Sequence, residues 1–389
     1  MGAKRRWPEG TRQVIPVSEP DLGPAELARV TEAILAGQIS SAGVGVPVFE
    51  ERWAAYCGRR HGVAVTNGTA ALQLAVACLD LEPGDEIIMP TFTIISCALA
   101  AAHCGAVPRL VDANPRTWCM DTGAIRNAIG PRTRAIMPVH IYGHPVDMDP
   151  ILDVAKQHGL AVIEDAAEAH GAEYRSARGG AETWLRCGSF GAMSCFSFYA
   201  NKLLTTGEGG MLVTDDDGLA QRARVLRNLS FEPGRRFRHD RLGFNFRMSN
   251  LQAALGIPQV ARMDDIVAKK RAMAAAYMRG LRDVAGIALP VEEPWAKSVF
   301  WMYGLVVDPE TGLDAEALSK RLADRGVETR PFFLGLHEQP VFRRLGWITY
   351  QKFPVAERLA RQGLYLPSGL GLRPEQVEQV IDAVRKSLP

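Results

Sequence analysis

The sequence has no long apolar run, no closely paired cysteines and no excess of one charge, and each absence excludes a class of protein. No apolar stretch approaches the roughly 18 residues that a membrane helix needs. The seven cysteines are scattered and form no C-x-x-C pair, so we expect reduced thiols in the core rather than disulfides or a zinc site. Lysine and arginine total 45 against 43 acidic residues, which argues against binding to nucleic acid through bulk charge.

The remaining composition is that of an ordinary soluble protein. The chain has 389 residues, of which 47% are hydrophobic and 23% charged, enough for one large and one smaller domain. Its start, MGAKRRWPEG, is basic but leads into no apolar segment, so we expect no secretory signal. These features predict a cytoplasmic protein without a membrane or nucleic-acid partner.

Short apolar segments alternate with helix-length stretches over much of the chain. The predicted strands are 63–66, 86–90, 108–112, 135–140, 161–165, 193–198 and 210–214. Such alternation is typical of βα units around a mostly parallel sheet, so we predict an α/β protein. Helices are expected over 69–79, which is rich in alanine, and over 151–158, with Asp149 as N-cap and Pro150 as the first helical residue.

The pattern changes from about residue 255, which predicts a second, smaller α+β unit. We expect a long charged helix over 259–284, strands over 301–308 and 327–333, and helices near 314–325 and 374–387. The domain organisation that follows is an N-terminal arm at 1–20, a large domain at 21–258 and a small domain at 259–389.

The segment VTNGTAAL at 65–72 is a candidate phosphate site. A predicted strand runs into Asn67, Gly68 and Thr69, and a helix starts at once, so free backbone N–H groups and a hydroxyl meet at one point. A capped connection without any ligand is an equally simple interpretation, because short glycine motifs are weak signals.

Two further segments carry residues that could act with such a site. The strand ending in Glu164 and Asp165 places a carboxylate beyond the carboxyl end of a parallel sheet, where it could pair with a cationic ring nitrogen or simply cap a loop. In SFYANKLLTTGEGG, Lys202 follows another strand in a turn rich in hydroxyls and glycine. A lysine at a desolvated site can form a Schiff base, although most lysines are solvated surface charges.

The three segments together predict a site for pyridoxal 5′-phosphate (PLP). A lysine holds the aldehyde of this cofactor, and an acidic residue pairs with its pyridinium nitrogen. A buried Asp165 would be costly without such a partner. Phe92, in PTFT after a further strand, could stack on the ring or be an ordinary core aromatic.

Motifs along nearly the whole chain resemble the nucleotide-sugar aminotransferases of the fold type I PLP enzymes. The matching stretches are NGTAAL (67–72), MPTFT (89–93), MPVHIYGHPVDMD (137–149), EDAAEAHGAEY (164–174), SFYANKLLTTGEGGMLVT (197–214) and GFNFRMSNLQAALG (243–256). The resemblance implies a fold like that of aspartate aminotransferase, in which a large domain with a mostly parallel seven-stranded sheet precedes a smaller α+β domain.

The resemblance also implies roles for individual residues. Lys202 matches the Schiff-base lysine and Asp165 the partner of the ring nitrogen. The other matched positions are Gly68, Thr69 and Ser197 for the phosphate, Phe92 for stacking, Glu168 (often Gln in relatives) beside the phenolic oxygen, Asn245 for the phosphate of a neighbouring subunit, and Arg330 and His337 around the sugar. The position of Asn245 in this pattern implies a homodimer with shared sites.

The segments GHPVDMD, EDAAEAHG and ETRPFF (328–333) indicate the branch that aminates a GDP-linked 4-keto-6-deoxysugar with L-glutamate, which leaves as 2-oxoglutarate. Amination at C3, or of dTDP or UDP sugars, stays open. PLP-dependent sugar dehydratases of the family typically carry histidine at the position of Lys202, and non-catalytic regulators would not need the intact Lys202, Asp165 and Ser197.

Three other features of the sequence each allow a binding role. The stretch 175–187 is longer than the usual connection and could reshape the mouth of the site. The basic run 235–239 could bind a nucleotide diphosphate or be a solvated loop. His140 and His144, near Asp147 and Asp149, suggest metal ligands, but Gly143 and Pro145 disfavour a helical face there, so we expect no metal.

Overall fold

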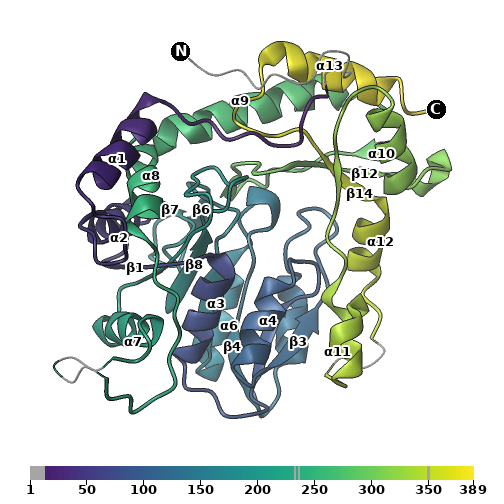
Figure 1. The fold of residues 1–389 in the computed structure, drawn as a ribbon. Helices are drawn as coiled ribbons and strands as arrows, with labels where there is room; N and C mark the ends of the chain where they lie inside the picture. The colour runs from purple at the N-terminus through teal and green to yellow at the C-terminus, as the bar shows by residue number, and fades with distance from the viewer. Residues whose placement is uncertain (1–13, 232–233, 235–236, 348–350) are drawn as a thin grey trace.

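The computed structural model describes residues 14–231, 234, 237–347 and 351–389. Its centre is a seven-stranded sheet in the order β1-β9-β8-β5-β4-β2-β3 (Figure 1). The strands are β1 (His61–Val65), β2 (Glu86–Pro90), β3 (Val107–Val111), β4 (Thr133–Ile136), β5 (Ala161–Asp165), β8 (Met193–Ser197) and β9 (Gly210–Thr214). Strand β9 pairs antiparallel with both of its neighbours, and the other pairings are parallel. The predicted α/β class with a mostly parallel sheet is therefore confirmed, and all seven predicted strands lie in this sheet.

The helices that contact this sheet include α2 (Gly45–Tyr56), α3 (Gly68–Ala77), α4 (Ser96–His103), α6 (Met148–His158) and α7 (Asp217–Arg227). Helix α3 packs against β8 and β9, and its alanines let the helix approach the sheet closely. Helix α6 begins earlier than predicted, with Asp147 rather than Asp149 as N-cap. The reason is that Asp149 serves another segment: its carboxylate accepts hydrogen bonds from Ser176 Oγ (2.6 Å) and the Ala177 amide (2.8 Å).

The rest of the chain forms a four-stranded antiparallel sheet with helices beside it (Figure 1). Its strands are β10 (Ile287–Ala288), β12 (Tyr303–Val307), β14 (Gly363–Leu366) and β13 (Arg330–Pro331), and the helices include α10 (Ala315–Ala323), α12 (Pro354–Gln362) and α13 (Pro374–Arg385). The strand expected over 327–333 is thus reduced to two residues. The predicted arm also contacts this sheet, because the Val17 amide donates to Glu328 (3.0 Å); residues 1–13 of that arm lie outside the described residues.

The single long helix expected over 259–284 is in fact two helices, α8 (Asn250–Ala261) and α9 (Met263–Leu281). Arg262 between them leaves the helical conformation (φ −112°, ψ 20°). Its guanidinium donates to the Asp21 carbonyl (2.5 Å) and to Glu26 (3.2 Å), at the start of α1 (Pro24–Leu35). Among the described residues, no helix is both long and apolar enough to cross a membrane.

The stretch 175–187 forms a hairpin of β6 (Glu173–Ser176) and β7 (Thr183–Arg186), which joins β11 (Ala296–Lys297) in a three-stranded sheet. Its Arg186 guanidinium donates to the Tyr56 carbonyl (2.9 Å) at the end of α2. The hairpin therefore connects α2 with the segment around residue 296. None of the hairpin residues lines the cavity described below.

Helix α9 carries a fully buried lysine, Lys270, whose amine donates to the carbonyls of Trp301 (2.8 Å) and Ser368. Burial lowers the pKa of Lys270 to about 7 from the usual 10.5. Between these two pH values the unfolded chain binds more protons at this residue than the folded chain does. The contribution of Lys270 to the free energy of unfolding therefore rises with pH across this window.

We expect Lys270→Met to remove this dependence, because methionine fills similar volume without a titrating group. The stability of the wild type relative to this variant should rise from pH 7 to pH 10, by at most about 1.4 kcal/mol per pH unit. Melting temperatures measured in parallel over that range check the prediction, with Lys269→Met, an exposed neighbour that pairs with Asp21 (3.0 Å), as control. A constant difference between wild type and Lys270→Met would contradict it.

Candidate active site

A cavity of about 600 Å³ opens at the carboxyl ends of β5 and β8. Six of the residues selected from the sequence line it, namely Gly68, Thr69, Asp165, Glu168, Ser197 and Lys202. They come from three segments that are distant in the sequence. The structure therefore brings together the phosphate candidates, the strand-end carboxylates and the lysine.

The phosphate candidates lie at the first turn of α3. Asn67 is the N-cap, and its side chain accepts from the Ala70 amide (2.8 Å). A side chain at position 68 would bring its Cβ within 2.7 Å of Ser197 Cβ, so glycine permits the close approach of α3 and β8. Thr69 Oγ1 lies 2.8 Å from Ser96 Oγ of α4, a lining residue that the sequence analysis missed. Hydroxyls and helix amides that converge in this way suit a phosphate group.

Asp165 is buried at the end of β5, with its side chain in reach of few hydrogen-bond donors. The Cys97 thiol donates to it (3.1 Å), and so does the Ala167 amide (3.0 Å). Burial raises the pKa of Asp165, and these hydrogen bonds and the charge of Lys202 only partly oppose it. A protonated ring nitrogen in the cavity would supply a cationic partner for this buried carboxylate. The residues present therefore fit pyridoxal phosphate.

Lys202 lies in the turn after β8, and its amine faces two groups. Its Nζ is 3.7 Å from Glu168 Oε1 and 3.5 Å from the ring centre of Trp301. The Trp301 indole N–H donates to the Asn201 carbonyl (2.9 Å), which fixes the ring beside the lysine. Burial lowers the pKa of Lys202, against the opposite effect of Glu168 and Asp165. Trp301 is a second lining residue that the sequence analysis missed, since no motif joins it to Lys202.

Phe92 does not line the cavity, contrary to the expectation that it stacks on a ring there. Its ring is buried among other aromatic side chains, 5.8 Å from that of Phe332 and 6.1 Å from that of Tyr142 between ring centres. Ile94, two residues later, lines the cavity instead. This packing matches the alternative of a core aromatic, and the stacking role of Phe92 stays a prediction.

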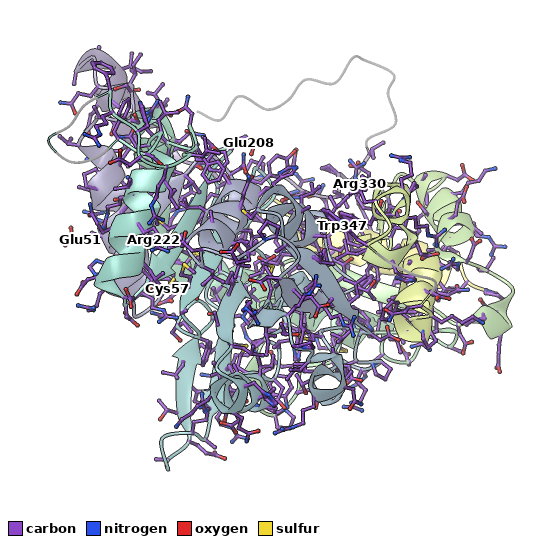
Figure 2. The ribbon with its side chains drawn as sticks, turned by 90° about the horizontal axis from the view of Figure 1, so that it is seen from below. Glu51, Cys57, Glu208, Arg222, Arg330 and Trp347 are labelled. Carbon is purple, nitrogen blue, oxygen red and sulfur yellow. The ribbon has the colours of Figure 1, made fainter. Side chains whose placement is uncertain are left out.

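The remaining three predicted site residues also lie outside the lining. Arg330 is on β13 in the C-terminal part of the molecule and pairs with Glu328 (2.7 Å). Figure 2 shows Arg330 apart from Glu208, which is one of the residues that line the cavity. His337 is buried, with Nδ1 2.8 Å from Thr91 Oγ1. Asn245 forms a backbone bridge with Asn228, next to Phe246, which does line the cavity. The roles of these residues stay predictions.

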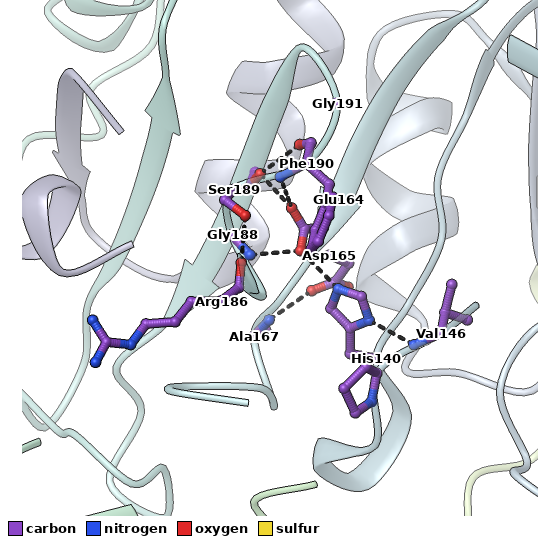
Figure 3. Close-up of polar contacts among 12 residues, drawn as sticks. His140, Val146, Glu164, Asp165, Ala167, Arg186, Gly188, Ser189, Phe190 and Gly191 are labelled. Atoms are coloured by element: carbon purple, nitrogen blue, oxygen red, sulfur yellow. Dashed lines mark hydrogen bonds and ion pairs between the residues drawn. The ribbon is translucent and has the colours of Figure 1, made fainter. Parts of the chain in front are cut away.

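His140 takes part in a buried hydrogen-bond network rather than one with His144 (Figure 3). Its Nδ1 accepts from the Val146 amide (2.9 Å), so Nε2 carries the proton and donates to Glu164 Oε1 (2.7 Å). Glu164 also accepts from the Gly188 amide (2.5 Å), the Phe190 amide (3.0 Å) and Ser194 Oγ (2.7 Å). Burial would raise the pKa of Glu164, but these hydrogen bonds lower it overall. The Cys187 sulfur is near enough to His140 and Glu164 for a shared metal, yet the carboxylate is already saturated with donors.

The family model described as the DegT/DnrJ/EryC1/StrS aminotransferase family matches residues 20–385. The GDP-perosamine synthase of Caulobacter vibrioides is 40% identical over 375 residues, which are 96% of this chain and 98% of the relative. The dTDP-3-amino-3,4,6-trideoxy-alpha-D-glucose transaminase of Streptomyces venezuelae is 38% identical over 368 residues, 93% of each chain. The X-ray structure of S. venezuelae DesV superposes with a TM-score of 0.85 at 37% identity, covering 93% of both chains.

The sheet, the helices around it and the lysine-bearing cavity define an aminotransferase of the fold type I class. More narrowly, the chain belongs to the DegT/DnrJ/EryC1/StrS aminotransferase family, whose members use PLP.

Proposed function

We propose that this chain is a PLP-dependent aminotransferase that converts a nucleotide-linked 4-keto-6-deoxysugar into its 4-amino sugar, with L-glutamate as the amino donor. The proposed substrate is GDP-4-keto-6-deoxy-D-mannose and the product GDP-perosamine, in a cytoplasmic enzyme. The observation that carries the proposal is that Lys202 and Asp165 face one cavity with the phosphate candidates at its edge. The similarity to the GDP-perosamine synthases of C. vibrioides and of Escherichia coli O157:H7 (38% identical) supports the choice of sugar.

PLP, when bound, supplies an aldehyde that can be attached to an amine and a ring that accepts the electron pair released when a proton leaves the substrate carbon. Gly68, Thr69 and Ser197 would hold its phosphate, and Lys202 its aldehyde carbon. Asp165 would keep the ring nitrogen protonated, which its burial favours. Once its Nζ is free, Lys202 would take the proton from the donor carbon and return it to the carbon on the other side of the amino nitrogen. The Trp301 ring, whose centre is 3.5 Å from Nζ, would shield this side of the amine from water.

A homodimer with shared sites is part of the proposal. Helix α1 exposes large apolar side chains, with Leu27 70% and Leu35 83% exposed, which a second copy could cover. A second cavity of about 910 Å³ beside α7 is lined in part by Arg224 and Arg247, near Asn245, and would suit an anionic group of a neighbouring site. Mixing inactive Lys202→Ala and Asn245→Asp subunits tests this idea. Activity should reappear if one subunit completes the site of the other, and its absence would contradict shared sites.

The assay that tests the proposed reaction offers glutamate and a panel of GDP-, dTDP- and UDP-linked keto sugars to the PLP-loaded enzyme. We expect 2-oxoglutarate to form with the GDP-4-keto-6-deoxy sugar. Amination at C3 of a dTDP sugar is the second candidate, since the S. venezuelae transaminase is nearly as similar. Activity confined to dTDP or UDP sugars would overturn the proposed substrate, and no activity with any of them would overturn the reaction.

Asp165→Asn should lower kcat by about 10² to 10³-fold, the usual cost of removing one electrostatic stabiliser at an active site. Asparagine keeps the size of the side chain but removes the charge that would hold the ring nitrogen protonated. Steady-state kinetics at saturating PLP check this, and Glu208→Gln, a change at another acidic lining residue, is the matched control. Equal kcat values for Asp165→Asn and the wild type would contradict the assigned role.

A further inference from the structure

Three buried carboxylates follow one another at the end of β5, and they differ in what they face. Glu164 is saturated by the donors described above, and Asp165 accepts from Cys97 and Ala167. Glu168 Oε2 accepts from the Tyr142 amide (2.7 Å), whereas Oε1 lies 3.7 Å from Lys202 Nζ. Within the described part of the chain, Glu168 is the carboxylate that forms an ion pair with Lys202.

The position of Glu168 is set from the opposite side by an unusual backbone. Tyr142 has φ 52° and ψ 18°, in the left-handed region that bulky residues rarely adopt. This conformation accompanies the amide hydrogen bond to Glu168 Oε2, and the Tyr142 ring is packed 4.7 Å from that of Phe332 between ring centres. The packed ring and the amide hold one carboxylate oxygen, which leaves the other oxygen directed at Lys202.

The surroundings bring the proton affinities of the two groups closer together. Burial raises the pKa of Glu168 to about 7, although the charge of Lys202 opposes this, and burial lowers the pKa of Lys202. Both changes favour the neutral acid and the neutral amine over the ion pair. The other titratable groups that act on one or both of them are Asp165, Cys97, Cys119, Tyr142, His170 and Tyr365. Among these, Asp165 acts on both.

We propose that Glu168 is the proton partner of Lys202: it accepts a proton from the Lys202 ammonium when this amine has to react, and it returns a proton when the reaction requires one. In the first step an N–H bond of Lys202 breaks and an O–H bond forms at Oε1, so the ion pair becomes a neutral amine and a neutral acid. The two atoms have to approach each other by less than about 1 Å to reach hydrogen-bond distance.

The purpose of this exchange depends on the proposed function. When the neutral amine adds to the aldehyde of PLP, a C–N bond forms and the aldehyde oxygen must leave as water. Glu168 would supply one of the two protons that this oxygen needs and the amine the other, while the nitrogen keeps its second hydrogen and the positive charge beside the Glu168 carboxylate. A glutamic acid can supply this proton directly, whereas the amide of a glutamine at the same position would have no such proton to give.

The first test measures Lys202 in the protein without cofactor. Competitive acetylation with acetic anhydride across pH 5 to 10, followed by mass spectrometry of the peptide, gives the titration midpoint of Lys202, with the exposed Lys156 as internal reference. Glu168→Gln keeps an acceptor for the Tyr142 amide but loses the charge. We expect the titration midpoint of Lys202 to fall by about one pH unit or more in this variant. At a pH below the wild-type midpoint, Lys202 of the variant should therefore be labelled about ten-fold more than Lys202 of the wild type. Glu208→Gln should leave the midpoint unchanged.

The second test measures proton return. At pH 7, where the wild-type Glu168–Lys202 pair still holds a proton, formation of the coloured complex with PLP should be about ten-fold or more slower in Glu168→Gln once the rates are divided by the fraction of neutral Lys202 found by acetylation, because the variant has no acid for the leaving oxygen. Equal midpoints in the first test would overturn the coupling, and equal loading rates in the second would overturn the transfer. If Glu168→Gln does not fold, Glu168→Asp, which keeps the acid but shortens it, should give the same slowing. Failure of the proposed function appears separately, as wild-type protein that stays colourless while the first test still succeeds.

Discussion

Lys202→Ala is expected to lower turnover by at least about 10³-fold, the largest effect on activity that the site predicts. The variant loses both the amine that would hold the cofactor and the group that would move the proton between carbons. Among the cavity-lining residues that the structure describes, Lys202 contributes the only lysine amine. Two measurements check the prediction: kcat with glutamate and the keto sugar, and borohydride reduction followed by mass spectrometry, which should attach the cofactor at position 202 in the wild type alone.

Lys202→Arg is the matched control for charge. Arginine keeps a cation beside Glu168 and Trp301 but stays protonated, so it should be as inactive as alanine while the fold is preserved. Near-normal turnover in either variant would remove the central residue of the proposed function. Rescue of Lys202→Ala by added methylamine would support proton transfer as one of its two roles.

The strands of the central sheet could be predicted because each is a short apolar segment between helix-length stretches. Residues of β8 and β9, for example, are buried almost throughout, so their sequences are apolar on both faces. The helix break at Arg262 could not be predicted in this way. Its cause is a tertiary contact with Asp21 and Glu26, more than two hundred residues earlier, which leaves no periodic signal.

The candidate site could be predicted only where chemistry and chain position coincide. Asp165 and Lys202 each follow a buried strand, so their approach at one edge of the sheet follows from the topology. A segment of four residues such as PTFT does not reveal which side chain faces the cavity: Ile94, just after it, lines the cavity, whereas Phe92 does not. Trp301 reaches Lys202 from the region of the second sheet, and such a contact has no counterpart in any local motif.

Glu164→Leu is expected to have the largest effect on stability, a loss of about 3–5 kcal/mol in the free energy of unfolding. Removing this carboxylate leaves His140 Nε2 and two backbone amides without their acceptor in a buried region. Glu164→Gln, which keeps an acceptor oxygen, should cost less. Urea denaturation followed by circular dichroism measures both.

The control for this prediction is Glu182→Leu on the hairpin, where an exposed carboxylate pairs with Arg175 (3.0 Å). Exposed pairs contribute little, so its effect should stay below about 1 kcal/mol. If Glu164→Leu were equally mild, the network would tolerate the loss of its centre. The orientation of Asp165, the next residue on β5, would then have to depend on Cys97 and Ala167 alone, because they hold its carboxylate from the other side. If instead Glu164→Leu is strongly destabilising while Glu164→Gln binds PLP normally, the hydrogen bonds to residue 164 fix the end of β5. They thereby hold Asp165, the next residue, in position at the cavity.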